Sequence, residues 1–194
     1  MSFILGLTGP TGAGKGVFSA CAKEYGFNVI DCDCVARKAV KKGMPALNAL
    51  TEVFGKEILL KSGELDRKKL ALIAFSSREN TELLNKTVLP FIKEMVLKEI
   101  KGDYVLLDAP TLFESGIDSI CDKTVGILAP LTIRKERIIS RDGIDEISAE
   151  RRILAGKDDG FYRQKTDFII YNDGNIENFI KEVKIYLENL IGGV

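Results

Sequence analysis

The segment from Gly9 to Lys15 limits the possible folds of this chain more than any other part of the sequence. It has the pattern Gly-x-x-x-x-Gly-Lys, follows the apolar run Phe3–Leu7, and precedes a helical pattern that starts near Val17. Between a strand and a helix, glycine N–H groups can wrap around phosphate oxygens, and the helix N-terminus adds its dipole. The alternative is a tight turn that only connects the two elements. The pattern predicts a phosphate-binding loop in an α/β protein.

The residues of this loop are the predicted ligands of the ATP phosphates. Its glycines permit positive φ angles and close approach of the backbone, and Lys15 supplies a mobile cation for the β and γ phosphates. The predicted ATP-binding residues of the loop and of the helix start are Gly9, Thr11, Gly12, Ala13, Gly14, Lys15, Gly16 and Val17.

Gly16 departs from the usual form of such loops, which carry Ser or Thr after the lysine to hold Mg²⁺. Because Mg²⁺ usually keeps several waters, we expect water to replace the hydroxyl and the metal to bind more weakly. Asp108 ends the apolar run Tyr104–Leu107 and is the predicted second acid near the triphosphate, able to orient metal-bound water. An aspartate that merely caps a turn is the alternative.

Five short apolar runs read as strands, and helical patterns separate them. The runs are Phe3–Leu7, Asn28–Asp31, Tyr104–Asp108, Thr124–Leu128 and Phe168–Tyr171. They lack polar alternation, which is typical of strands buried on both faces. We therefore expect an α/β fold with a parallel, five-stranded, doubly wound sheet, whose ligands lie at the carboxyl ends of the strands. At 194 residues the chain is expected to form one unit, residues 1–194.

The segment from about Gly43 to Ile100 is mostly helical in pattern, and Pro90 is expected to break it. A regular apolar stripe predicts a final helix between Ile176 and Ile191 that packs on the sheet. Asp33 is the predicted N-cap of a helix that starts near Cys34.

Charge and composition exclude several classes of partner. Lysine plus arginine and aspartate plus glutamate both total 28, so no global field favours nucleic acid or an anionic membrane. No apolar run approaches the ~20 residues of a membrane span, and the start lacks the pattern of a signal peptide, so we expect a cytoplasmic protein. Cys32 and Cys34 lack the histidine or second cysteine pair that a zinc site needs, which favours free thiols.

Asp33 and a set of arginines are candidates for the chemistry itself. Asp33 follows the second strand, where its carboxylate could accept the proton of an acceptor hydroxyl and orient it. Arg134, Arg137 and Arg141 are spaced i, i+3 and i+7, which places three guanidinium groups on one helix face. A solvated charged face is the alternative, but mutual repulsion between these cations favours a nearby triphosphate.

Several segments together resemble the dephospho-coenzyme A kinases, a branch of the nucleoside-monophosphate-kinase-like P-loop fold. They occur in family order between about residues 4 and 174. The matching segments are Leu5–Gly9, Gly12–Lys15, Val29–Asp33 with Ala36 and Arg37, Phe54–Gly55, Gly63–Arg67, Asp108–Glu114, Arg137, Arg141–Gly143 and Asn172–Gly174.

The resemblance implies ATP-dependent phosphorylation of the ribose 3′-hydroxyl of dephospho-coenzyme A, with ATP, Mg²⁺ and the acceptor as small-molecule partners. It implies that Asp33 is the base, that Lys15 and Arg141 assist catalysis, and that Arg137, Asn172 and Gly174 bind ATP. The implied acceptor-binding residues are Asp33, Arg37, Arg67, Asp108 and Glu114. A helical acceptor-binding subdomain is implied at 40–95 and a helical lid at 134–165.

Two further positions depart from the family. Leu89 stands before Pro90 where the family usually has histidine, and Ala155–Lys157 stands where it usually has glutamine. These departures concern acceptor affinity and lid geometry. A related kinase for another nucleotide or small molecule, and a nucleotide-binding protein with little catalysis, are the alternative functions; the sequence does not indicate an oligomeric state.

Overall fold

The computed structural model describes residues 2–193 and contains the predicted parallel sheet. Its strands are β1 (Phe3–Thr8), β2 (Asn28–Asp31), β3 (Tyr104–Asp108), β4 (Lys123–Leu128) and β5 (Phe168–Tyr171). All neighbouring pairs are parallel, and the strand order is β2-β3-β1-β4-β5. The predicted α/β fold class is confirmed, and three of the five strands begin and end where the sequence placed them.

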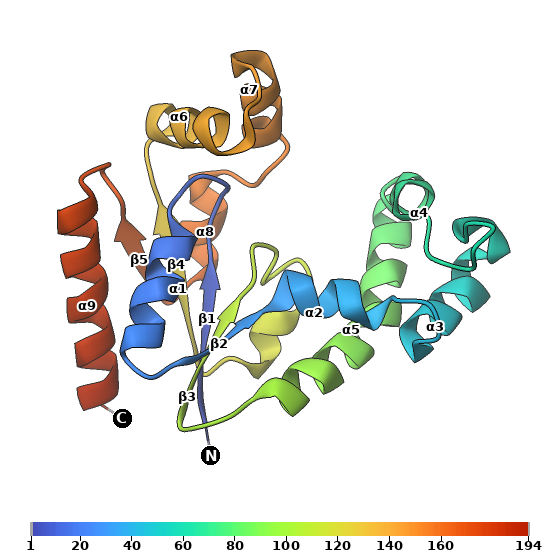
Figure 1. Cartoon of the computed structure of the whole chain (residues 1–194), viewed down its shortest axis with the longest axis horizontal. Helices are drawn as coiled ribbons and strands as arrows, with labels where there is room; N and C mark the ends of the chain where they lie inside the picture. The colour runs from blue at the N-terminus through green and yellow to red at the C-terminus, as the bar shows by residue number, and fades with distance from the viewer. Residues whose placement is uncertain (1, 194) are drawn as a thin grey trace.

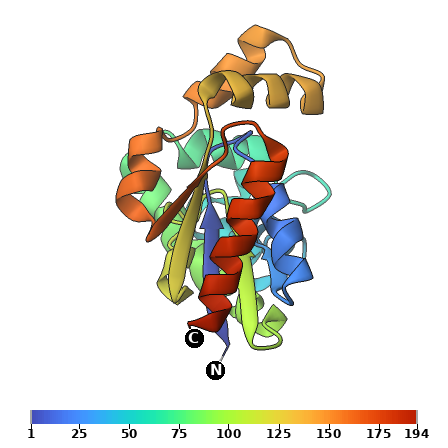
Figure 2. The same ribbon diagram turned by 90° about the vertical axis from the view of Figure 1, so that its left-hand side faces the viewer.

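One face of the sheet is covered by α1 (Lys15–Glu24) and α9 (Ile176–Gly192), which lie side by side in Figures 1 and 2. Phe18 of α1 and Phe179 of α9 are buried with Leu5 and Leu7 of β1 in one apolar cluster. The stripe predicted for the last helix therefore packs on the sheet, as expected. These contacts fix the start of α1, and hence the loop before it, on the central strand.

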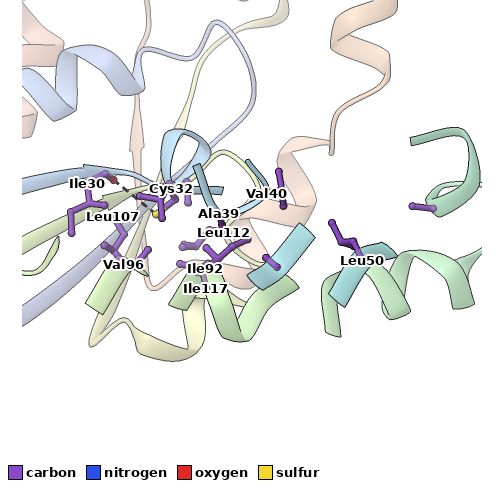
Figure 3. Packing of buried hydrophobic residues seen from close by; sticks show 14 of the residues in the cluster. Ile30, Cys32, Ala39, Val40, Leu50, Ile92, Val96, Leu107, Leu112 and Ile117 are labelled. Carbon is purple, nitrogen blue, oxygen red and sulfur yellow. Dashed lines mark hydrogen bonds between the residues drawn. The ribbon is translucent and has the colours of Figure 1, made fainter. Parts of the chain in front are cut away.

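The other face carries α2 (Cys32–Ala39), the second half of α5 (Arg78–Glu99), η2 (Ile117–Ile120) and α8 (Asp159–Lys165). Figure 3 shows Ile30 and Leu107 of the sheet packed near Val96 of α5 and Cys32 of α2. The cluster extends outward to Leu50, so the sheet core and the helical projection share one apolar interior. None of the helices between residues 2 and 193 is long and apolar enough to cross a membrane.

Two groups of helices extend beyond the sheet (Figure 1). The first comprises α3 (Pro45–Phe54), η1 (Lys56–Ile58), α4 (Arg67–Ala74) and the first half of α5, and falls in the predicted 40–95 segment. The second, α6 (Leu131–Asp142) and α7 (Glu146–Leu154), lies above the carboxyl ends of the strands; it overlaps the predicted 134–165 segment, although α6 already begins at Leu131. The helical content of both segments is as expected; their roles as acceptor subdomain and lid stay predictions.

The expectation that Pro90 breaks its helix is wrong, because α5 continues from Arg78 to Glu99. Proline removes one N–H donor and crowds the carbonyl four residues earlier, which bends a helix without necessarily ending it. Leu89 and Ile92, on either side of Pro90, both contact the apolar cluster, and this packing holds the two halves together. Figure 1 shows the helix changing direction along its length.

The loop between β1 and α1 has the backbone that its glycines predict. Gly9, Gly12 and Gly14 have φ angles of 140°, 79° and 114°. A Cβ at Gly9 would lie 2.3 Å from the Ile127 carbonyl oxygen, whereas a Cβ at Gly16 would meet no atom within 4 Å. Position 9 therefore requires glycine, because β4 lies too close for a side chain. Packing does not require glycine at position 16.

We predict opposite effects on stability for alanine at these two glycines. Gly9→Ala should lower the free energy of unfolding by about 2 kcal/mol or more, because the methyl group overlaps β4 and the φ angle is strained. Gly16→Ala should raise it by about 0.5–1 kcal/mol, because Gly16 lies inside α1, where alanine costs less conformational entropy. Urea unfolding of both variants measures the two values, and equal stability of the two would contradict the geometry.

Candidate functional site

A cleft lies at the carboxyl edge of the sheet, where the glycine loop, two strand ends and α6 meet. Parallel pairing places Leu7 and Asp31 level with Asp108, so the residues that follow β1 and β2 gather beside the end of β3. The cleft has a volume of about 910 Å³. Its lining comprises Thr11, Gly12, Gly14, Lys15, Gly16, Val17, Asp31, Asp33, Asp108, Pro110, Glu136, Arg137, Ser140 and Arg141.

Most of the sequence-predicted loop residues line this cleft, together with Asp33, Asp108, Arg137 and Arg141. Asp31, Pro110, Glu136 and Ser140 also line it, although the sequence did not single them out for binding. Asp31 was recognisable as one of two acids after a strand. The other three come from loops and helix faces whose orientation depends on tertiary packing.

The N-cap of α2 is Asp31, so the expectation that Asp33 has this role is wrong. The Asp31 carboxylate accepts a hydrogen bond of 2.8 Å from the backbone N–H of Cys34, and the helix begins at Cys32. The first acid after the strand can reach N–H groups of the first turn, because it still has extended backbone geometry. Asp33 then lies within the first turn, and its carboxylate faces the cleft.

Asp33 lies where two hollows meet. It lines the main cleft and also a second hollow of about 340 Å³ between α2, α4 and α5. Leu50, Leu70 and Phe75 contribute to the apolar lining of this second hollow, and Arg37 and Arg67 add two cations. The Arg67 guanidinium donates to the backbone carbonyl oxygen of Arg37 at 3.3 Å, which ties the Arg67 side chain to α2 beside this hollow.

The charge on Asp33 is under opposing influences. Burial raises the pKa of its carboxyl, the nearby Asp31 raises it further, and Arg37 and Lys15 lower it. A carboxylate that is partly desolvated, yet close to two cations, can accept a proton more readily than one in free solution.

Lys15 is turned back onto its own loop. Its ammonium donates to the carbonyl oxygen of Gly9 at 2.6 Å and to that of Pro10 at 3.3 Å. Burial lowers the pKa of Lys15 to about 8, although Asp108 and Asp33 oppose this shift. The protein thus holds a cation at the base of the cleft that an entering anion would stabilise.

Asp108 is held by a residue that the sequence reading missed. The Ser19 hydroxyl, on α1, donates to Oδ2 of Asp108 at 2.8 Å, and the Ser19 side chain is buried. Burial raises the pKa of Asp108, while the bond from Ser19 and the charge of Lys15 lower it. Ser19 lies one helical turn before Ala22 of the apolar pattern, and this spacing could have indicated that it faces the sheet.

The three arginines of α6 do not share one role, which corrects the expectation of a single arginine face. Arg134 is only 2% exposed; its Nε donates to the Thr11 carbonyl oxygen at 3.0 Å, and its guanidinium lies 3.6 Å from Asp159. Lys135 pairs with Glu146 and Glu150 on α7. Asp159 and Asp142 therefore pair with Arg134 and Arg141, which reduces the repulsion that had favoured an anion. Arg137 and Arg141 are the arginines that line the cleft.

Arg137 is tied to the glycine loop through the buried side chain of Asn172. Its guanidinium donates to the Gly12 and Ala13 carbonyl oxygens at 3.2 and 3.3 Å, and to Oδ1 of Asn172 at 3.2 Å. The Asn172 amide in turn donates to the Ala13 carbonyl oxygen at 2.9 Å. Asn172 is 1% exposed, so its side chain supports the loop from behind.

The remaining predicted residues lie outside the main cleft. Gly174 follows β5, and a Cβ there would lie 2.6 Å from Ile133 of α6. Glu114 lies in the loop after β3, where its backbone carbonyl accepts from Asn85, and its Oε2 is buried with no hydrogen-bond partner among residues 2–193. Within the same residues, no group of three or more His, Cys, Asp or Glu side chains could hold a metal ion without help from a ligand.

Comparison with known proteins identifies the family. The family model for dephospho-CoA kinase, named CoaE, matches residues 3–178. The chain belongs to the dephospho-CoA kinase family. Curated dephospho-CoA kinases of Enterococcus faecalis and Fusobacterium nucleatum are each 38% identical to it; the first alignment covers 99% of both chains, and the second 96% of this chain and 98% of the relative. The resemblance seen in the sequence is thereby confirmed.

Solved structures agree with this family and with the fold. A dephospho-CoA kinase from Campylobacter jejuni is 26% identical, with a TM-score of 0.67 over 100% of this chain and 99% of that one. The protein TT1252 from Thermus thermophilus is 28% identical, with a TM-score of 0.79 over 97% and 98%. A shikimate kinase from Bacteroides thetaiotaomicron, at 15% identity and a TM-score of 0.55 over 98% of both chains, shares the fold alone.

The departures from the dephospho-CoA kinase pattern occupy distinct places in the structure. Gly16 lies in the cleft, at an exposed position of α1. Leu89, in α5, packs against the loop after β3, since a Cβ at Gly116 would lie 3.1 Å from its Cδ2. Gly156 follows the C-cap residue of α7, Ala155, and lies outside the cleft lining. Of these three, Gly16 is the one that affects the cleft directly.

We predict that Arg37→Met raises the pKa of the Asp33 carboxyl further above its ordinary value, because it removes a cation that stabilises the charged form. Lys38→Met is the matched control, since Lys38 pairs with Glu99 and does not line either hollow. A pH titration of the Asp carboxyl carbons by NMR measures the pKa in both variants. An unchanged Asp33 titration in Arg37→Met would contradict the proximity of the two charges.

Proposed function

We propose that this chain catalyses ATP-dependent phosphorylation of the ribose 3′-hydroxyl of dephospho-coenzyme A, giving coenzyme A and ADP, the last step of coenzyme A synthesis. The observation that carries this proposal is the place of Asp33, which lines both the cleft beside the glycine loop and the second hollow. A carboxylate at this junction can contact an acceptor hydroxyl that points toward a phosphoryl donor.

The main cleft has the properties of a triphosphate site. The backbone of Gly12 and Gly14, the start of α1 and the ammonium of Lys15 provide donors and positive charge at one end. Arg137 and Arg141 add cations from α6 on the opposite side. In phosphoryl transfer these groups act mainly by holding the donor in line and by stabilising charge that spreads over the transferred phosphoryl oxygens.

The second hollow suits an acceptor that is anionic at one end and neutral along the rest. Dephospho-coenzyme A carries a diphosphate beside its ribose and a long, mostly neutral arm. Arg37 and Arg67 are available to the diphosphate, and the apolar lining that includes Leu70 is available to the arm. Glu114 does not line this hollow, so its assignment to the acceptor depends on the family resemblance alone.

Magnesium fits the donors that the cleft offers. Asp108 is one of the carboxylates near Lys15, and Mg²⁺ is commonly bound by one or two carboxylates, phosphate oxygens and water. When bound with ATP, Mg²⁺ would neutralise part of the charge of the phosphates. Because position 16 has no hydroxyl, water would take its place, and Asp108 would be the residue that orients metal-bound water.

Asn172 and Gly174 belong to the proposed nucleotide site through the backbone that they support. The Asn172 side chain holds the Ala13 carbonyl and Arg137, which leaves the turn around Gly174 as the part that could lie beside adenine. A cytoplasmic location, with ATP available and four free cysteine thiols kept reduced, is part of the same proposal.

The direct test is coupled ADP release from purified protein with ATP, Mg²⁺ and dephospho-coenzyme A. We expect release that depends on the acceptor, with other nucleosides and small alcohols turned over more slowly. Folded protein that binds ATP but releases no ADP with dephospho-coenzyme A would refute the proposal. Faster turnover of another acceptor would instead identify a related kinase.

We predict that Asp33→Asn lowers kcat by about 10²–10⁴-fold, because the amide cannot accept the hydroxyl proton. The KM for ATP should change little, since the glycine loop and the arginines are unaltered. Steady-state kinetics separates the two constants, and Asp103→Asn, on an exposed residue before β3, serves as the control. Unchanged kcat in Asp33→Asn would remove this residue from the mechanism.

We predict that ATP affinity falls as pH rises through about 8, the lowered pKa of Lys15. The sign follows because ATP favours the charged ammonium, which is present below this pKa and lost above it. The dissociation constant should rise by up to about tenfold per pH unit above it. Nucleotide binding measured from pH 6.5 to 9.5 gives the profile; Lys15→Met should bind more weakly at low pH and show a flat profile.

A further inference from the structure

The Ser19 side chain contacts Asp108, the acid proposed to lie near the metal, from outside the cleft. It lies in α1, is 8% exposed and is absent from the cleft lining. Its hydroxyl donates to Oδ2 of Asp108 at 2.8 Å, and no other hydrogen bond to this carboxylate occurs among residues 2–193. The side-chain hydrogen bond of Ser19 therefore reaches the cleft lining at Asp108.

The position of Ser19 is significant because of Gly16. In loops of this kind the hydroxyl after the lysine and the acid at the end of the neighbouring strand both hold Mg²⁺. Here that hydroxyl is missing, although a Cβ at Gly16 would meet nothing within 4 Å and a serine would fit. Ser19 supplies a hydroxyl one turn later on the same helix, directed at the acid rather than into the cleft.

The bond restrains the direction of the Asp108 carboxylate. With Oδ2 fixed to α1, the side chain cannot rotate freely about its terminal torsion, and Oδ1 remains for the cleft that Asp108 lines. Residues that hydrogen-bond to a metal-binding carboxylate, without touching the metal themselves, orient that carboxylate and tune metal affinity. The bond also connects β3 to α1, so that the acid and the glycine loop keep a fixed relation.

We propose that Ser19 is a positioning residue that orients Asp108 toward the metal-bound water of MgATP and so compensates in part for the hydroxyl missing at position 16. This inference rests on the proposed function of the same cleft. It assigns Ser19 an effect on the magnesium dependence of nucleotide binding, and no effect on the binding of ATP without metal.

The experiment is a magnesium titration of fluorescent ATP-analogue binding to the full chain, without acceptor. For Ser19→Ala we expect the magnesium midpoint to rise about tenfold, the usual effect of losing an outer-shell partner. Binding in EDTA should stay as in the wild type. Ser62→Ala, in an exposed turn after η1, is the matched control and should move neither value.

Two further variants test whether Ser19 acts through Asp108. Asp108→Asn should raise the magnesium midpoint, and Ser19→Ala combined with it should raise the midpoint no further. Gly16→Ser in the Ser19→Ala background should lower the midpoint again, because it returns a hydroxyl to the cleft where space is open. Thermal unfolding of each variant confirms that it is folded.

The outcomes separate this inference from the proposed function. Failure of wild-type protein to bind the nucleotide with Mg²⁺ would refute the proposed function. Wild-type binding with an unchanged midpoint in Ser19→Ala would overturn the inference alone. Weaker binding by Ser19→Ala in EDTA, or additive effects in the double variant with Asp108→Asn, would also overturn it, since both indicate a role that does not pass through Asp108.

Discussion

The parallel pairing of β3 with both β1 and β2 is the constraint on which the rest of the site depends. Its register sets Leu7, Asp31 and Asp108 level with one another, so three chain segments leave the sheet at the same edge. The glycine loop, the start of α2 and the loop after β3 then share one space. Because the strands pack into an apolar cluster on each face, a slip in register would disrupt the packing on both faces, so this arrangement is maintained by the whole core.

The sequence predicted the parts of this arrangement that local chemistry controls. Strands buried on both faces have no polar alternation, and the glycine pattern permits the positive φ angles that a phosphate-binding loop needs, so the sheet and the loop were readable from single segments. The N-cap was not, since Asp31 and Asp33 are both suitable acids and the choice depends on where β2 ends. Arg134 was misread because spacing gives a helix face but not the burial of that face, which depends on Thr11 and Asp159.

Asn172 illustrates a contribution that sequence motifs describe poorly. A motif can mark a residue as part of a nucleotide site, but the structure places this amide behind the loop, with both its donor and its acceptor used inside the protein. Buried polar groups with all partners satisfied specify one arrangement, because any other leaves a costly unpaired group. The loop carbonyls, Arg137 and the turn after β5 are held by one side chain.

The burial of Arg134 has a mechanical consequence for α6. The N-terminal turn of this helix is fastened to the glycine loop through the Thr11 carbonyl, and to α8 through Asp159. Moving this turn away would leave the Arg134 guanidinium, the Thr11 carbonyl and the Asp159 carboxylate without their partners, which is costly in free energy. The helix is thus anchored at its N-terminal end, and Arg141, about two turns beyond this anchor, is held through Asp142, which also pairs with Arg152 of α7.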